Sequence, residues 1–311
     1  MSNFAMVFPG QGSQAVGMLA DLATAFPIVE ETFKQASDVL GYDLWDLVQN
    51  GTAEDLGQTQ RTQPALLASS VAIYRVWQQK YPELKPSVMA GHSLGEYSAL
   101  VCAGVLDFQY AIKLMELRSN AMQQAAPAGT GAMHAIIGLD NQAIINACEQ
   151  AQAEVGEIVS AVNFNSPGQV VIAGTKAAAE KAGELCKAAG AKRALPLAVS
   201  VPSHCALMKP AADKLAEALQ NITLNAPVVP VINNVDVSVE TDAEAIRNAL
   251  VHQLYSPVRW TETVEKMANE GVTTLYEIGP GKVLTGLAGR IVKELNAKAV
   301  NDVASLEAVT Q

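Results

Sequence analysis

The sequence predicts an α/β protein: a mainly parallel β-sheet covered by helices, into which a small second domain is inserted. Strand-like and helical segments alternate along most of the chain, which is typical of a parallel sheet with helices on both faces. Between residues 130 and 198 the order changes to βαββαβ, the order of a split βαβ or ferredoxin-like unit. We therefore expect a large α/β domain formed by residues 1–129 and 199–311, and a ferredoxin-like small domain formed by residues 130–198.

Length and composition agree with two folded domains and exclude several classes of function. The chain has 311 residues, of which 50% are hydrophobic and 17% charged, enough to build sizeable cores. Its 31 acidic residues outnumber its 21 basic ones and give a net charge of −10, so we expect no nucleic-acid binding. The four cysteines are scattered without a C-x-x-C pair, which argues against a zinc site or disulfides and for a reducing compartment. We find no signal peptide and no uncharged stretch that could span a bilayer, so the sequence predicts a cytoplasmic protein without membrane contact.

The first part of the chain alternates between strand and helix patterns. A strand at Asn3–Phe8 leads into the glycine-rich turn Pro9–Ser13, and a second strand is expected at Ser87–Ala90. Apolar residues at helical spacing, in one case with a proline at the start, predict helices at Ile28–Leu40, Pro64–Trp77, Leu94–Ala103 and Phe108–Gln124.

The middle of the chain carries the six elements of the small domain. Short runs of β-branched and apolar residues predict strands at Ala132–Gly138, Ile158–Phe164, Gln169–Ala173 and Lys192–Val199. Helical periodicity predicts helices at Asn141–Gln152 and Lys176–Ala189, and a turn is expected at Asn165–Gly168.

The last part of the chain returns to alternating elements. Helices are expected at Leu207–Gln220, Ala243–Leu254, Thr261–Asn269 and, as the last one, Val283–Leu295. Strands are expected at Val228–Ile232 and Thr274–Ile278.

The segment Gly91-His92-Ser93-Leu94-Gly95 is the clearest chemical motif, a G-x-S-x-G between a predicted strand and a predicted helix. In that context a strained turn exposes the serine hydroxyl above the sheet, and the glycines allow the backbone to pass close to its neighbours. The first helical turn leaves the Leu94 N–H unpaired near the same point, where it can donate to an oxyanion. Ser93 is therefore a candidate nucleophile.

A nucleophilic serine needs a base, and the chain has four histidines. His92 adjoins Ser93, and adjacent side chains at such a turn usually diverge; His134 lies in a predicted strand and favours a packed core position. His252 lies on a predicted helix and favours the surface. His204 lies in an irregular loop and follows the serine along the chain, as the base does in α/β-hydrolases, so it is the preferred candidate.

Three further patterns point to structure more than to chemistry. Gly10, Gly12 and Ala15 form a weak dinucleotide-binding fingerprint, but Glu30 and Glu31, at the spacing of the ribose-binding acid, fall inside a predicted helix. For this opening turn, a loop that supplies a second oxyanion donor is a better interpretation than a nucleotide site. The segment 279–282 lacks P-loop spacing, and Cys205 is interpreted as a small buried thiol.

Several segments together resemble the malonyl-CoA:acyl carrier protein transacylases of bacterial fatty acid synthesis and, more distantly, the acyltransferase domains of polyketide synthases. The resemblance covers nearly the whole chain, and it is carried by Pro9–Gln14, Gly91–Gly95, Pro202–His204, Gln60–Pro64, Val162–Gly168, Asn233–Val235 and Glu277–Gly281. The resemblance implies a hydrolase-like α/β domain with a ferredoxin-like insertion.

The resemblance also implies roles for six residues. Ser93 would accept the acyl group, His204 would be its base, and the Gln253 backbone carbonyl would orient the histidine. The backbone N–H groups of Gln11 and Leu94 would hold the oxyanion. Arg118 would bind the malonyl carboxylate, although a lone helix arginine in this pattern would otherwise be interpreted as solvent-exposed.

The function implied is transfer of a malonyl group from malonyl-CoA to the phosphopantetheine thiol of acyl carrier protein through a malonyl-serine, with no metal or other cofactor. Two alternatives remain open: a serine esterase or thioesterase that passes the acyl group to water, and a non-catalytic docking module that keeps the fold. For the acidic carrier protein we expect a basic docking patch within residues 181–215, which carry a net charge of +4, or else at Lys282, Arg290 and Lys293.

Overall fold

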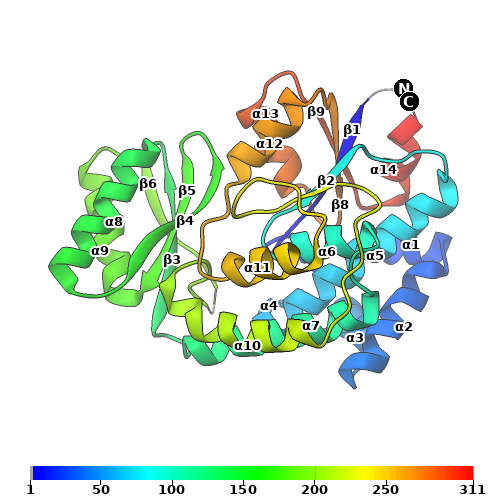
Figure 1. Ribbon diagram of the computed structural model, residues 1–311, viewed down its shortest axis with the longest axis horizontal. Helices are drawn as coiled ribbons and strands as arrows, with labels where there is room; N and C mark the ends of the chain where they lie inside the picture. The colour runs from blue at the N-terminus through cyan, green and yellow to red at the C-terminus, as the bar shows by residue number, and fades with distance from the viewer. Residues whose placement is uncertain (1–2, 200, 311) are drawn as a thin grey trace.

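Two β-sheets organise the part of the chain that the structure describes, residues 3–199 and 201–310 of a computed structural model (Figure 1). The larger sheet has the strand order β7-β2-β1-β8-β9, and every neighbouring pair in it is parallel. Its strands are β1 (Phe4–Phe8), β2 (Val88–Gly91), β7 (Val231–Ile232), β8 (Thr274–Ile278) and β9 (Asn296–Val300). A parallel sheet covered by helices confirms the predicted fold class.

The central strand β1 explains why both faces of this sheet are covered. Side chains alternate between the two faces of a strand. Phe4, Met6 and Phe8 belong to one apolar core, whereas Ala5 and Val7 belong to a second one on the opposite face. A strand that is apolar on both faces must be buried on both.

Helices supply the other halves of these two cores. Two helices cover the Ala5 face, α12 (Trp260–Asn269) and α13 (Val283–Ile291). The helices of the Phe4 face are α1 (Ala20–Ala25), α2 (Ile28–Leu40), α3 (Leu44–Asn50), α4 (Ala53–Gly57), α5 (Thr59–Lys80), α6 (Gly95–Cys102), α7 (Phe108–Ala125), α10 (Lys209–Gln220), α11 (Ala243–Gln253) and α14 (Val303–Glu307). None of the helices within residues 3–199 and 201–310 is both long and apolar enough to span a lipid bilayer.

The second sheet lies at one end of the molecule and is antiparallel, with the order β4-β5-β3-β6 (Figure 1). Its strands are β3 (Gly131–Ile137), β4 (Val159–Ser166), β5 (Gln169–Thr175) and β6 (Arg193–Pro196). Helices α8 (Asn141–Val155) and α9 (Lys176–Ala188) share a core with it. The predicted order βαββαβ is therefore confirmed, while the domain boundaries at 130 and 198 stay our proposal.

Several predicted boundaries differ from the structure for identifiable reasons. Helix α5 begins at Thr59 and contains Pro64, whereas the sequence predicted a start at Pro64. A proline within a helix removes one N–H, here the bond to the Gln60 carbonyl, and the rest of the helix continues. The strand predicted at Val228–Ile232 is shortened to two residues, because Pro230 has no N–H to donate to a ladder.

The C-terminal region contains the largest error. The sequence predicted one last helix over Val283–Leu295, but α13 ends at Ile291 and is followed by strand β9 and helix α14. Strand β9 lies at the sheet edge and is mostly half-buried, so its residues show no clear apolar alternation. The short helices α1, α3 and α4 were also missed, because five to seven residues are too few to display a helical period.

Candidate active site

The turn between β2 and α6 places Ser93 in a strained conformation with φ of 54°. Only glycine fits two residues before and two residues after Ser93. A Cβ on Gly91 would lie 1.9 Å from the Gly95 carbonyl carbon, and one on Gly95 would lie 2.1 Å from the Phe8 oxygen. The chain therefore crosses the end of β1 more closely than any side chain would allow. This is the strand–turn–helix context that the G-x-S-x-G motif predicted.

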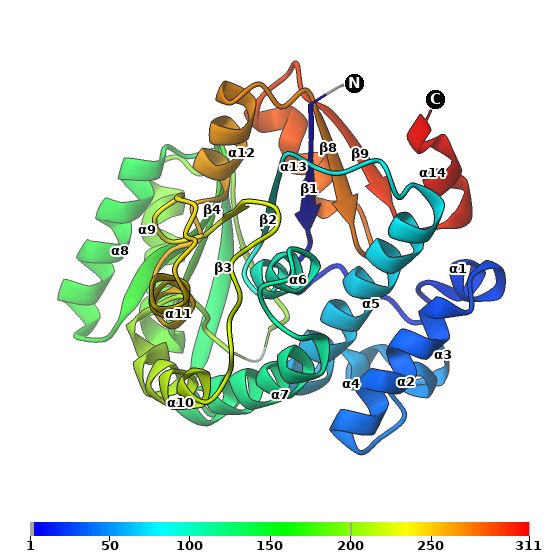
Figure 2. The same ribbon diagram turned by 45° about the vertical axis from the view of Figure 1, so that its right-hand side comes forward.

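Ser93, His204 and Gln253 form a chain of hydrogen bonds, although they come from three distant parts of the sequence. The Ser93 Oγ lies 2.8 Å from His204 Nε2, and His204 Nδ1 lies 2.7 Å from the Gln253 backbone oxygen. A carbonyl oxygen can only accept, so Nδ1 carries the proton and Nε2 is free to accept from the serine hydroxyl. In the view of Figure 1, α11, which ends at Gln253, lies between the small sheet and α6, and Figure 2 shows the same helices from another side.

The surroundings keep the His204 imidazole neutral. Burial lowers its pKa to about 3, the positive charge of Arg118 and the neighbouring His92 act in the same direction, and the hydrogen bond to the Gln253 carbonyl opposes them. The side chain is only 3% exposed. An imidazole that is neutral near pH 7 can take a proton from a nucleophile and return it.

Arg118 lies in the same site and is buried, with 1% of its surface exposed. Its Nη1 donates to Gln63 Oε1 at 2.6 Å, and its Nη2 donates to Gln253 Oε1 at 3.0 Å and to Ser93 Oγ at 3.3 Å. Its Nε has no hydrogen-bond partner among the described residues. The solvent-exposed position that the helix pattern favoured is therefore wrong, and a guanidinium reaches the serine hydroxyl.

A cavity of about 340 Å³ surrounds the serine and is lined from both sheets. Gln11, Leu94 and His204 line it from the large-sheet side, and Met133 and Asn163 line it from the small sheet. The backbone N–H groups of Gln11 and Leu94, the predicted oxyanion donors, find no acceptor among the residues that the structure describes. Both residues are thus at the cavity with an unused donor.

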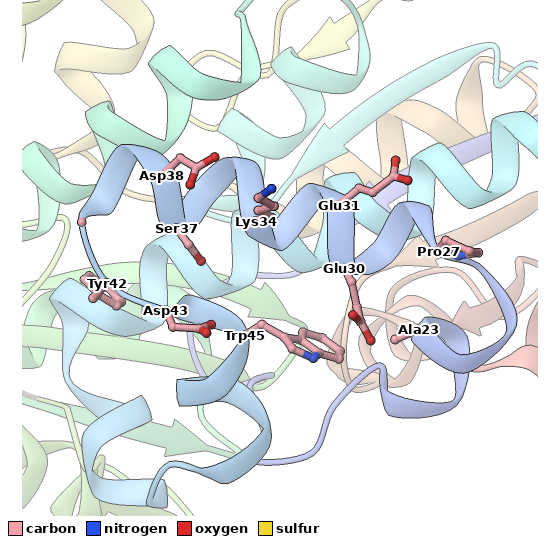
Figure 3. A pocket seen from close by; sticks show the side chains of 11 residues that line it. Ala23, Pro27, Glu30, Glu31, Lys34, Ser37, Asp38, Tyr42, Asp43 and Trp45 are labelled. Atoms are coloured by element: carbon pink, nitrogen blue, oxygen red, sulfur yellow. The ribbon is translucent and has the colours of Figure 1, made fainter.

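A larger hollow of about 980 Å³ lies elsewhere, along α2 and the start of α3 (Figure 3). It is an open groove whose lining includes Glu30, Asp38 and Trp45. Among the described residues that line it, Ser37 is the one serine and there is no histidine, and the Ser37 hydroxyl donates to the Phe33 carbonyl of its own helix. The serine–histidine pair therefore lies at the smaller cavity and not at this groove.

Three polar residues behind the serine were not singled out from the sequence. Asn234 accepts from the Ser93 N–H through Oδ1 at 2.8 Å and donates through Nδ2 to the Gly91 oxygen at 2.7 Å. Glu96 is buried and lies next to Gln253, and Gln63 holds Arg118. Asn234 and Gln63 fall within two of the segments that carried the family resemblance, which was the only available signal.

The remaining histidines and cysteines take no part in the hydrogen-bond chain of Ser93, His204 and Gln253. His92 Nε2 lies 2.8 Å from Asn165 Oδ1, His252 is exposed, and His134 is half-buried rather than a core residue. Cys205 is buried, which raises the pKa of its thiol to about 11. Within the described ranges, no three His, Cys, Asp or Glu side chains are grouped so that they could hold a metal ion.

Comparison with known proteins gives a consistent result over the whole chain. Residues 5–310 match the family described as acyl transferase domain. The chain is 75% identical over 311 residues to the malonyl CoA-acyl carrier protein transacylase of Haemophilus influenzae, which covers 100% of this chain and 99% of that protein. The protein of the same name from Escherichia coli is 67% identical over 311 residues, 100% of both chains.

Solved structures give the same picture. An acyl carrier protein S-malonyltransferase from Vibrio cholerae is 70% identical, covers 99% of this chain and 100% of its own, and superimposes with a TM-score of 0.96. A malonyl-transacylase in complex with its type II PKS acyl-carrier protein is also 70% identical, covers 99% of this chain and 98% of its own, and superimposes with a TM-score of 0.97.

Proposed function

Since the chain belongs to the acyl transferase family and, within it, to the malonyl CoA-acyl carrier protein transacylases, we propose that it transfers a malonyl group from malonyl-CoA to acyl carrier protein through a malonyl-Ser93 intermediate. One observation carries the serine step. The Ser93 hydroxyl lies 2.8 Å from a histidine nitrogen that can only accept a proton, beside a buried arginine. The proposal places the transferase in fatty acid synthesis.

In the first half-reaction, His204 Nε2 takes the hydroxyl proton while Ser93 Oγ attacks the thioester carbonyl carbon. The carbonyl oxygen becomes an oxyanion, and the Gln11 and Leu94 N–H groups donate to it. When the C–S bond breaks, the coenzyme A sulfur takes the proton from His204 and leaves as a thiol. The product is a malonyl ester of Ser93.

The second half-reaction repeats these steps with another thiol. His204 takes the proton of the phosphopantetheine thiol, and the sulfur attacks the ester carbonyl. The Ser93 Oγ then leaves and takes the proton back, so the enzyme returns to its starting state. The coenzyme A thioester is a substrate, and the proposal names no further cofactor.

Arg118 gives the site its preference for an acyl group that ends in a carboxylate. A guanidinium binds a carboxylate through two parallel hydrogen bonds, and burial strengthens such contacts. Its Nη2 already lies 3.3 Å from the Ser93 Oγ, so a carboxylate one short acyl chain away from the ester is within its reach. An uncharged acyl group gains nothing from this residue.

Steady-state kinetics test the proposal. When malonyl-CoA and holo acyl carrier protein are varied together, a covalent intermediate predicts parallel lines in double-reciprocal plots. Intersecting lines would contradict it, because they require both substrates to be bound at once. Rapid release of malonate from malonyl-CoA without carrier protein would favour the thioesterase alternative.

A further inference from the structure

Glu96 is a buried carboxylate for which the mechanism above has no use. It lies in the first turn of α6, three residues after Ser93, and is 2% exposed. Its Oε2 accepts from the Asn234 backbone N–H at 2.9 Å and from Gln253 Nε2 at 2.9 Å. No salt bridge of the described residues includes it. Burying a carboxylate without an ion pair is unfavourable, so its position calls for an explanation.

The Gln253 side-chain amide connects this carboxylate to Arg118. Its Nε2 donates to Glu96 and also to the Ser93 carbonyl at 3.0 Å, while its Oε1 accepts from Arg118 Nη2 at 3.0 Å. The amide has only one acceptable orientation. If it were reversed, its NH₂ group would face the donor Nη2 and its oxygen would face the acceptor Oε2.

We propose that Glu96 is a positioning and specificity-determining residue, which fixes the Gln253 amide and thereby directs Arg118 toward the malonyl carboxylate. Gln253 contacts the nucleophile and the base as well. Its side-chain Nε2 donates to the Ser93 carbonyl, and its backbone oxygen accepts from His204 Nδ1. The inference rests on the function proposed above, since it presupposes that Arg118 binds the acyl carboxylate.

The groups that face Glu96 agree with this role. Burial raises the pKa of Glu96 to about 7, and Asp236 adds to that effect, whereas Gln253, Asn234 and the charge of Arg118 oppose it. The protonated carboxyl keeps a carbonyl oxygen and the ionised one keeps two acceptors, so an acceptor faces Gln253 in either state.

The test replaces Glu96 by methionine, which has a similar length but no oxygen that can accept. Glu96→Met removes the acceptor that faces Gln253 Nε2, so the Gln253 amide loses its single orientation. We expect the KM for malonyl-CoA to rise roughly tenfold, while kcat/KM for acetyl-CoA changes by less than about threefold. Glu277→Met is the matched control: Glu277 is also buried, but it accepts from Leu284 and Thr285 at the start of α13. It should leave the malonyl-to-acetyl ratio unchanged.

A double variant separates a positioning role from a merely structural one. In an Arg118→Ala background, Glu96→Met should cause no further change in the malonyl-to-acetyl ratio, because the residue through which it acts is gone. An equal loss with both acyl groups, or an unchanged effect in that background, would overturn the inference. If Glu96→Met does not fold, Gln253→Met keeps the backbone carbonyl and removes the amide, and it must produce the same malonyl-specific loss; an unchanged ratio would refute the inference.

Failure of this inference can be told apart from failure of the proposed function. If the unaltered protein is acylated by malonyl-CoA and Arg118→Ala removes its selectivity, the function stands whatever Glu96→Met does. If Arg118→Ala leaves the selectivity intact, the premise itself is wrong.

Discussion

Ser93 Oγ and His204 Nε2 lie 2.8 Å apart, and both residues hold their backbone in the left-handed region, with φ of 54° and 65°. Only four non-glycine residues in the described part of the chain have positive φ, and these are two of them. Such conformations cost on the order of 1–3 kcal/mol each and persist only where surrounding contacts fix them. Here Asn234 holds the Ser93 N–H and the Leu254 carbonyl holds the His204 N–H. These backbone hydrogen bonds thus hold Ser93 and His204 in the conformations that bring their side chains into contact.

Replacing the glycine at the start of α6 should disrupt this arrangement. A Cβ in Gly95→Ala would lie 2.1 Å from the Phe8 oxygen, and we expect a loss of roughly 1–3 kcal/mol or more in the free energy of unfolding. Gly289→Ala in α13 is the control, because a Cβ added there would meet nothing within 4 Å beyond its own helix, and it should stabilise the protein by up to about 1 kcal/mol. Urea denaturation measures both. Equal stability of the two variants would refute the close approach at Gly95.

Removing the buried arginine should change which acyl group is transferred. Arg118→Ala loses a charge-assisted contact of roughly 1.5–3 kcal/mol, so malonyl transfer should fall roughly ten- to hundredfold. Acetyl transfer should be kept or increased, because an acetyl group no longer leaves a buried charge unpaired. Arg75→Ala, which removes a half-buried arginine bound to Thr32 and Gln35, is the control and should leave the acyl preference unaltered. Equal losses of malonyl and acetyl transfer in Arg118→Ala would indicate a structural role instead.

Acid should destabilise the protein partly through His204. Its pKa is about 3 in the folded protein and ~6.5 in an unfolded chain, so between these values the unfolded state binds the extra proton. The stabilising contribution is complete above pH 6.5 and is lost as the pH falls toward 3. Between pH 7.5 and 5.5, the wild type should lose about 1 kcal/mol more than His204→Asn. Thermal denaturation of both proteins at the two pH values measures this difference; an identical pH dependence would mean that the imidazole is solvated.

Three of the basic residues within 181–215 remain the best candidates for the predicted docking patch. Lys181 forms a salt bridge with Glu154 at 2.8 Å, whereas Lys187, Lys192 and Arg193 are exposed. Arg193 begins β6, and the chain after β6 lines the cavity at Leu197. Reversing these three charges should raise the KM for acyl carrier protein and leave the half-reaction with malonyl-CoA intact, and high salt should reduce the effect.

The control for this patch reverses three exposed lysines elsewhere, Lys34, Lys85 and Lys113. It produces the same change in net charge and should have a smaller effect on the carrier protein KM. If the two triple variants behave alike, the docking site lies elsewhere, and Lys282, Arg290 and Lys293 become the next set to reverse.

The fold was predictable wherever local pattern and tertiary burial agree. Helix α2 and strand β8 have the predicted bounds, because the helix is amphipathic and the strand is buried along its whole length. Strand β9 was missed because a half-buried edge strand carries a weak pattern, and its pairing with β8 is a long-range contact that no local sequence window contains.

The site was predictable only to the extent that it is local. Ser93 follows from five adjacent residues, whereas its partner His204 is 111 positions away and was selected by loop position and by resemblance. The pattern alone would have left Arg118 in solvent, because burial on α7 depends on distant residues such as Gln63 and Gln253. Glu96 has no local signature at all, since its partners lie 138 and 157 positions away.

Intact-mass spectrometry tests the central claim most directly. After incubation with malonyl-CoA, the protein should gain the mass of one malonyl group, on Ser93 by peptide mapping, and should lose it when holo acyl carrier protein is added. Ser93→Ala should gain nothing. A malonyl adduct that forms on Cys205 or on another serine, or one that Ser93→Ala still acquires, would contradict the account.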